Sequence, residues 1–151
     1  MAHDSIREQI IQNVIDTVQN IENVKSVERS HPATPTILKK IPSTQLPRIG
    51  ITAGLPKPEK TLGDKMGDND FKINSNLQIV LSFFAQHKTS PDKWISFYLD
   101  ELWRELYKDQ TRGGLAVLTN LEPDIEDGVE SPYIGFYLII TVNYYHDTKG
   151  I

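Results

Sequence analysis

The sequence contains no cysteine among its 151 residues. Disulfides, thiol nucleophiles and thiolate metal sites are therefore excluded, and an intracellular site of folding is consistent with this absence. Long apolar runs are also missing: none reaches the roughly 18 residues that span a bilayer, and the first twenty residues lack the apolar core of a secretory signal. A composition of 38% hydrophobic and 24% charged residues predicts one soluble domain, residues 1–151.

Motifs for catalysis and cofactor binding are absent as well. The sequence has no GxSxG elbow and no phosphate loop of the GxxxxGK[ST] or GxGxxG type. Asp124, Glu126 and Gly128 resemble part of a calcium loop, but the glycine comes too early and no closing glutamate follows at the required interval. The four histidines, at positions 3, 31, 87 and 146, lack metal-site spacing. We therefore expect no enzyme, no cofactor and no metal.

Two of these histidines stand late in long predicted strands. His87 and His146 are interpreted as surface residues at strand ends, with the alternative that they neighbour each other in the sheet.

Charge is distributed unevenly along the chain. The net charge is −4, yet residues 25–72 carry +4 and residues 113–151 carry −5. The acidic total argues against a general nucleic-acid binder, because neutralising phosphates needs a basic face. The two segments are either solvated loops of different sign or complementary surfaces, which meet inside the fold or between neighbouring copies.

Two amphipathic helices are predicted from apolar residues at helical spacing. The first begins at a capping box, in which Ser5 accepts from the N–H three residues on and Glu8 reaches back, and it ends near residue 20. The second begins with Ser90 as N-cap and Pro91 at the first helical position.

The second helix carries more aromatic residues than one buried stripe can hold. They are Trp94, Phe97, Tyr98, Trp103 and Tyr107. Packing in the core is the ordinary role of such residues, and a ligand pocket or a partner anchor is the alternative.

Strand periodicity dominates the remaining sequence. Apolar and polar residues alternate from Phe71 to Lys88, a run of about 50 Å or more at roughly 3.3 Å per residue, which exceeds what a compact domain of this length needs. Residues 56–70 are predicted to be an exposed loop or a hairpin connection whose tip extends the flanking strands. Further strands are predicted at residues 24–29, 48–53, 115–123 and 133–146.

This order of elements indicates an α+β fold. We expect a mixed, mostly antiparallel β-sheet with two helices packed on one face and a long projecting β-hairpin.

The arrangement resembles the tail terminator, or tail-completion, proteins of long-tailed bacteriophages, also called minor tail proteins. The resemblance covers most of the chain and rests on the order of five segments, with the glycine pair before Leu115 weighing most. The segments are IREQIIQNVIDTVQNIENVKSVER, LPRIGITAG, FKINSNLQIVLSFFAQ, YLDELWRELYKDQTRGGLAVLTNLEP and GFYLIITVNYY.

The resemblance implies a structural role at the head-proximal end of the virion tail, after assembly in the host cytoplasm. Such proteins form a ring, expected to be hexameric, that caps the tail tube, ends its polymerisation and joins the tail to the head-side connector protein. The implied partners are further copies, the tail tube protein, the connector and, if the tail is contractile, the sheath. DNA passes through the ring without specific binding, no membrane is involved, and no catalytic residue is implied.

A head-to-tail ring uses two different patches on each subunit, which suits separate basic and acidic regions. An overlong hairpin can lie against a neighbour's sheet, so we expect residues 56–76 to lie at a subunit boundary or on the tail tube. The expected interface residues are Lys57, Lys60, Lys65, Asp68, Asp70, Phe71 and Lys72.

An acidic loop at residues 122–130 is expected to line the lumen of the ring or an interface. Its carboxylates are Asp124, Glu126, Asp127 and Glu130. Negative charge beside the DNA path avoids adhesion to phosphates.

Two alternatives remain open at this point. A head-tail connector or stopper protein of the phage neck is also an acidic, ring-forming α+β protein. A non-viral ligand-binding α+β domain would use the aromatic face of the second helix as a pocket.

Overall fold

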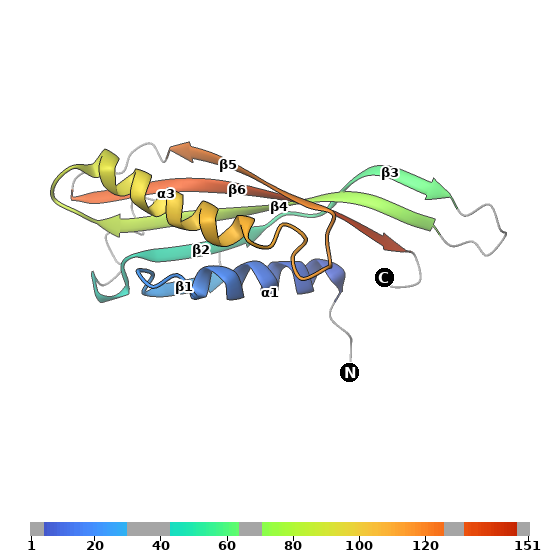
Figure 1. Ribbon diagram of the computed structural model, residues 1–151, viewed down its shortest axis with the longest axis horizontal. Helices are drawn as coiled ribbons and strands as arrows, with labels where there is room; N and C mark the ends of the chain where they lie inside the picture. Colours follow the sequence, from blue (N-terminus) through green and yellow to red (C-terminus); the bar gives the residue numbers. More distant parts are fainter. Residues whose placement is uncertain (1–4, 30–42, 64–70, 126–131, 148–151) are drawn as a thin grey trace.

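The computed structural model describes residues 5–29, 43–63, 71–125 and 132–147. Within these residues the chain forms two α-helices, a short 3-10 turn and six strands (Figure 1). The helices are α1 (Ile6–Gln19) and α3 (Pro91–Tyr107), and the turn is η1 (Ser43–Gln45). The strands are β1 (Ser26–Arg29), β2 (Arg48–Ala53), β3 (Lys57–Gly63), β4 (Phe71–Gln86), β5 (Leu118–Ile125) and β6 (Tyr133–Asp147). The predicted α+β class is confirmed.

Strands β4 and β6 form the central pair of the sheet. They run antiparallel over their whole length, from Lys72 opposite Asp147 to Gln86 opposite Tyr133. The other edge of β4 is shared by β2 and β3, which pair with its two halves in succession. Strand β5 pairs antiparallel with β6, and β1 pairs in parallel with β2. The order β1-β2-β4-β6-β5, with β3 beside β4, is the mixed, mostly antiparallel sheet that the sequence predicts.

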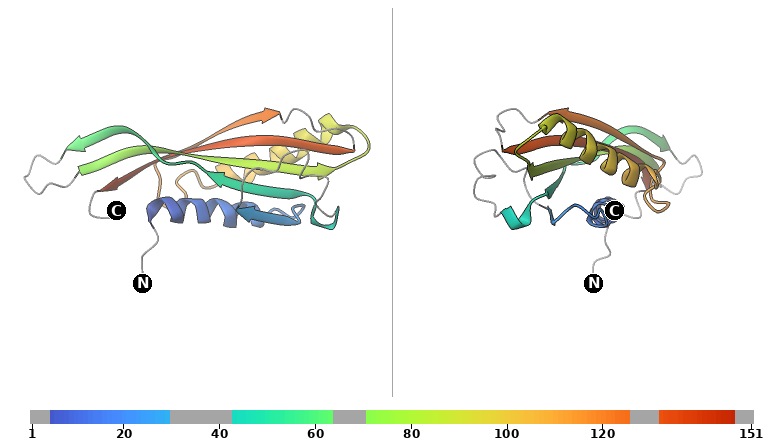
Figure 2. Two further views of the ribbon diagram at one scale, coloured as in Figure 1. Left: turned by 180° about the vertical axis from the view of Figure 1, so that it is seen from behind. Right: turned by 60° about the vertical axis from the view of Figure 1, so that its left-hand side comes forward.

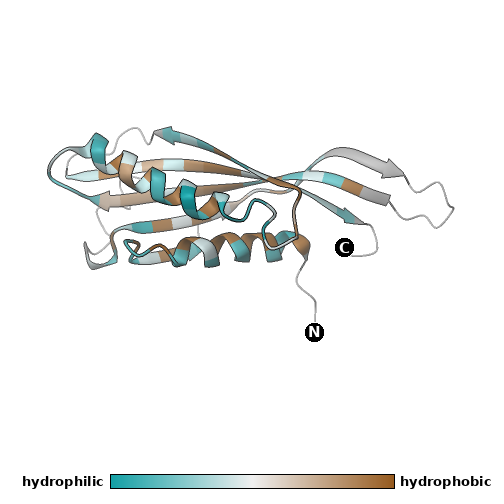
Figure 3. Cartoon of the chain, viewed as in Figure 1, coloured by the Kyte–Doolittle hydropathy of each residue, from teal (hydrophilic) through white to brown (hydrophobic). Residues whose placement is uncertain are grey.

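One face of this sheet is buried beneath both helices (Figure 2). Side chains alternate between the faces of a strand, so the odd positions of β4 and the even positions of β6 meet on the helical side. These positions include Leu77, Ile79, Leu81 and Phe83 opposite Val142, Ile140, Leu138 and Phe136, all at most 2% exposed. Helix α1 adds Ile10, Ile11, Val14, Ile15 and Val18, and α3 adds Tyr98, Leu102 and Leu106. Apolar residues accordingly gather along the sheet and on the inner sides of the helices (Figure 3).

The start of α1 confirms half of the predicted capping box. Ser5 Oγ accepts from the backbone N–H of Glu8 at 3.2 Å. The Glu8 carboxylate accepts from Arg29 Nη2 at 2.8 Å and from Arg7 Nη1 at 2.8 Å. It therefore joins α1 to β1, because a charged partner binds a carboxylate more strongly than a backbone N–H does.

The start of α3 differs from the prediction. Pro91 opens the helix as expected, but Ser90 adopts a left-handed conformation with φ 53° and its side chain makes no capping hydrogen bond. Its backbone carbonyl instead accepts from the N–H groups of Lys93 and Trp94, at 3.1 and 3.3 Å. Ser90 is therefore at the predicted N-cap position, but the prediction that its side chain caps the helix is wrong.

Strand β5 begins three residues later than predicted. Helix α3 is followed by a turn in which Gly113 and Gly114 have φ of 70° and 86°, a conformation that residues with a Cβ adopt at a steric cost. The N–H of Ala116 closes this turn on the carbonyl of Thr111 at 2.8 Å. Pairing with β6 starts only when the N–H of Val117 reaches the carbonyl of Asn143 at 2.8 Å.

The alternative that His87 and His146 are neighbours is wrong. His87 follows the end of β4, whereas His146 near the end of β6 lies opposite Ile73 near the start of β4. Because β4 and β6 are antiparallel, the two histidines lie at opposite ends of the sheet.

Candidate functional site

The candidate site is the end of the sheet that projects past the helices, here called the ribbon. It consists of β3, residues 71–76 of β4 and residues 143–147 of β6. Figures 1 and 2 show the β3–β4 hairpin continuing beyond α1 and α3. The predicted long strand and projecting hairpin are therefore both present, and residues 57–63 extend the strands instead of forming a loop.

A ladder of asparagine side chains fixes the register of the ribbon on the face away from the helices. Asn143 and Asn74 exchange side-chain hydrogen bonds in both directions at 2.9 Å, and Asn143 also donates to Asn76 Oδ1 at 2.8 Å. A one-residue slip would break all three bonds and reverse the faces. The ribbon is thus held in one register by polar contacts rather than by a thick core.

The opposite face of the ribbon is closed by Tyr144 and Ser75. Both are at most 2% exposed, and Ser75 Oγ lies 3.1 Å from His146 Nε2. The ring of His146 stacks on Tyr144 with centroids 5.4 Å apart. Burial raises the pKa of Tyr144, while the positive charge of Arg7 opposes that rise.

Arg7 fastens the root of the ribbon to α1. Its Nη2 donates to the carbonyl of Gly54 at 3.1 Å and to that of Ala53 at 3.5 Å, where β2 ends and before β3 begins. Arg7 also pairs with Glu8, which holds Arg29. The hydrogen bond from Arg29, together with the charges of Arg29 and Arg7, lowers the pKa of the Glu8 carboxyl despite the opposing effect of burial.

Both edges of β4 are occupied within the chain itself. Within the ribbon, the open edges belong to β3, whose partner among the described strands is β4, and to the last residues of β6, which run past the pairing with β5 at Asn143. An edge of this kind presents backbone N–H and C=O groups to another chain.

The structure brings four of the seven expected interface residues together on the ribbon. Lys57 is exposed and lies opposite Asn76; Lys60 lies opposite Asn74; Phe71 and Lys72 begin β4 opposite the end of β3. For Lys60, Phe71 and Lys72 the backbone alone is described. Lys65, Asp68 and Asp70 lie outside the described residues.

The acidic segment lies on the opposite edge of the sheet from β3. Asp124 belongs to β5, opposite Tyr137 of β6, and is exposed, as is Glu122. The predicted acidic loop therefore starts later than expected, because Asp124 and Ile125 continue β5. Glu126, Asp127 and Glu130 lie outside the described residues.

Two hollows flank these edges. A groove of about 560 Å³ lies at the junction of β2 and β3, lined by Gly54, Leu55, Pro56, Lys57, Asn76, Gln78 and Thr141. A smaller pocket of about 220 Å³ lies between α3 and β5, lined by Ile95, Leu99, Pro123, Asp124 and Phe136. Neither is lined by an aromatic residue of α3.

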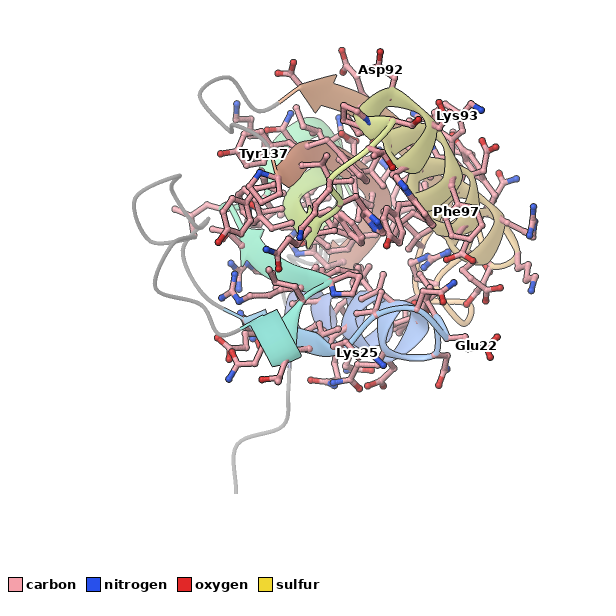
Figure 4. All side chains as sticks on the ribbon, turned by 90° about the vertical axis from the view of Figure 1, so that its left-hand side faces the viewer. Glu22, Lys25, Asp92, Lys93, Phe97 and Tyr137 are labelled. Atoms are coloured by element: carbon pink, nitrogen blue, oxygen red, sulfur yellow. The ribbon has the colours of Figure 1, made fainter. Side chains whose placement is uncertain are left out.

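Two aromatic residues of α3, Trp94 and Tyr98, pack with His87 at the far end of the molecule from the ribbon. His87 stacks on Trp94 with centroids 3.8 Å apart, and the Tyr98 hydroxyl lies 2.7 Å from His87 Nε2. Burial lowers the pKa of His87 and, with the charge of Glu101, raises that of Tyr98. Figure 4 shows Phe97 on the helical side and Tyr137 across the sheet from it. Tyr98 is buried in the core, Trp94 and Trp103 are half-buried, and Phe97 and Tyr107 are exposed, so the aromatic residues of α3 are divided between core and surface.

Arg112 is a residue whose role the sequence analysis missed. It is fully buried, with φ 49°, and its guanidinium donates to the carbonyls of Leu106 and Asp109 at the end of α3. Desolvation lowers its pKa, against the charge of Asp109. A single arginine after a helix carries no signal in sequence, because its burial depends on how α1 and α3 meet.

The described residues contain no group of three or more histidine, aspartate or glutamate side chains placed to hold a metal ion. Their helices include none long and apolar enough to cross a membrane.

No protein-family model matches the sequence, and no curated protein matches it. Among solved structures, the chain is similar to one described as "Virion of native gene transfer agent (GTA) particle", with a TM-score of 0.37 and 9% sequence identity, over 94% of this chain and 92% of that one. A TM-score this low does not establish a shared fold, and no function transfers from it.

Proposed function

We propose that this protein is a structural component of a phage-type virion that forms a ring on the head-proximal end of the tail tube. In this role it ends polymerisation of the tube and joins the tail to the head-side connector. The proposal extends the resemblance drawn from the order of sequence elements. The structural observation that supports it is the ribbon, whose length exceeds what the two helices cover.

The ribbon suits assembly for an energetic reason. The asparagine ladder sets the register of β4 against β6, β3 pairs with β4, and Arg7 holds the segment before β3. Little conformational entropy is therefore lost when another chain binds the ribbon. The open edge of β3 then offers backbone hydrogen bonds to a neighbour, which give register to a repeated contact. An isolated hairpin has no comparable stabilising role for its own domain.

A ring also needs two different patches on each subunit. The lysines of the ribbon and the carboxylates of β5 lie on opposite sides of the strand order. Each copy therefore offers a basic edge to one neighbour and an acidic edge to the other.

The proposal is tested by changing the charge of the ribbon. We expect Lys57→Glu, Lys60→Glu and Lys72→Glu together to reduce the oligomer measured by light scattering, and to give tails of abnormal length by electron microscopy of particles assembled with the variant. The matched control reverses the charges of Lys88, which follows β4, and Lys93, which lies in the first turn of α3; both are exposed and far from the ribbon. This control should assemble normally. Unchanged oligomers and normal tails in the ribbon variant would contradict the proposal.

Electron microscopy of particles lacking the protein separates this role from that of a connector or stopper. Loss of a terminator gives tails of abnormal length, whereas loss of a connector gives normal tails detached from heads.

A further inference from the structure

An exposed apolar side chain stands at the root of the ribbon. Leu55 is 81% exposed, between the end of β2 and the start of β3. A single exposed leucine is ordinary on a protein surface. The segment that carries Leu55 is unusual because it contains two prolines. It reads Leu55-Pro56-Lys57-Pro58, and the two prolines fix φ and keep the preceding residues extended. Leu55 and Lys57 are therefore presented in a stiff chain, which loses little entropy on binding.

The pocket between α3 and β5 has the complementary character. Its walls are apolar, formed by Ile95, Leu99, Pro123 and Phe136, and its volume of about 220 Å³ is sufficient for an aliphatic side chain. Asp124 supplies a carboxylate to the lining, and Glu122 is exposed on the same strand.

The two features lie on opposite edges of one sheet. Leu55 and Lys57 belong to the β2–β3 edge, and the pocket belongs to the β5 edge, with β4 and β6 between them. A subunit therefore cannot fill its own pocket with its own Leu55 without unfolding the sheet. A protrusion on one edge and a matching recess on the other make a head-to-tail contact that repeats from copy to copy.

We propose that Leu55 of one copy inserts into the pocket of Ile95, Leu99, Pro123 and Phe136 of the next copy, with Lys57 beside Asp124. The partner is a second copy of this chain, chosen by the match of apolar and charged groups. This inference deepens the proposed function and rests on it, because it specifies one contact of the proposed ring.

The test measures self-association of the full chain by sedimentation velocity over a concentration series. Leu55→Asp removes the apolar insertion and brings a carboxylate near Asp124, so we expect association about tenfold weaker or more. The matched control is Tyr107→Asp, which changes an exposed apolar side chain at the end of α3 and should associate as the parent chain does. Circular dichroism and thermal melting establish that each variant is folded. We expect Leu55→Asp to fold, because the Leu55 side chain is exposed and its replacement removes no core contact.

A charge exchange tests the pairing itself. Lys57→Glu and Asp124→Lys should each weaken association, and the two together in one chain should restore most of it. Mixing Leu55→Asp with Asp124→Lys chains should restore association between the two kinds of chain, because the former keeps an intact pocket and the latter an intact Leu55.

The outcomes separate this contact from the proposed ring. Rings of Leu55→Asp chains that match the parent would overturn the inference and leave the proposed function standing. Failure of the double charge exchange to restore association would overturn the placement of Lys57 beside Asp124. A parent chain that stays monomeric at every concentration would overturn the proposed function together with this inference.

Discussion

At the scale of single residues, stability depends on charged groups whose partners the sequence does not reveal. Ser5 was predictable as a cap because its acceptor role is local. Glu8 was not, since its partner Arg29 is 21 positions away and reaches it only after β1 folds beside α1. Arg112 is the clearest case, because its two carbonyl acceptors exist only where α3 ends.

Arg112→Ala is expected to lower the free energy of unfolding by about 2–4 kcal/mol, because it opens a cavity and leaves the carbonyls of Leu106 and Asp109 without a donor. Chemical denaturation measures the change. The control is Arg104→Ala on the exposed side of α3, which should change stability by about 0.5 kcal/mol or less. If Arg112→Ala were neutral or stabilising, the desolvation of the guanidinium would outweigh its hydrogen bonds.

His87 is expected to make stability depend on pH. Burial lowers its pKa in the folded state below the ordinary value of 6.5, so the unfolded chain binds the proton more readily. Its contribution to stability is therefore complete above about pH 6.5 and decreases as the pH falls through the lower folded pKa. The urea midpoint of unfolding should fall more between about pH 7.5 and pH 5.5 in the parent chain than in His87→Gln. An equal fall in the two chains would refute this role of His87.

At the scale of elements, hydrophobic periodicity predicts which face of a helix or strand is buried. It does not predict secondary structure that depends on pairing with another strand or on a neighbouring turn. The apolar stripe of α1 and the alternation in β4 both lie on the predicted faces. Strand β3 has weak strand propensity, with Pro58 and several charges, and is held by pairing with β4. Residues 115–117 look like a strand in sequence, yet Ala116 belongs to the turn that Gly113 and Gly114 begin.

Arg7→Gln is expected to loosen the root of the ribbon with little effect on the core. It removes the charged donor to Gly54, which costs about 1–3 kcal/mol locally. Hydrogen exchange should accelerate at Gly54, whose N–H donates to Gln78, and in β3. Gln12→Ala, on the exposed side of α1, serves as control. Unchanged exchange in Arg7→Gln would mean that β4 pairing alone holds the root.

At the scale of the whole molecule, the chain has a thick half and a thin half. The thick half has helices packed on the sheet, and the thin half is the ribbon (Figure 1). Sequence reasoning anticipated this division from the length of the β4 pattern. It did not anticipate that both edges of β4 are filled by its own chain, because strand order is not encoded in periodicity. Any edge-to-edge contact that the ribbon makes with a neighbour must therefore use β3 or the end of β6.

The central claim is that the ribbon contacts an adjacent copy. Electron cryomicroscopy of the purified, assembled protein tests it directly. The account predicts a closed ring in which residues 57–63 and 71–76 lie against the neighbouring subunit. A monodisperse monomer, or a ring whose ribbons touch no other copy, would contradict it.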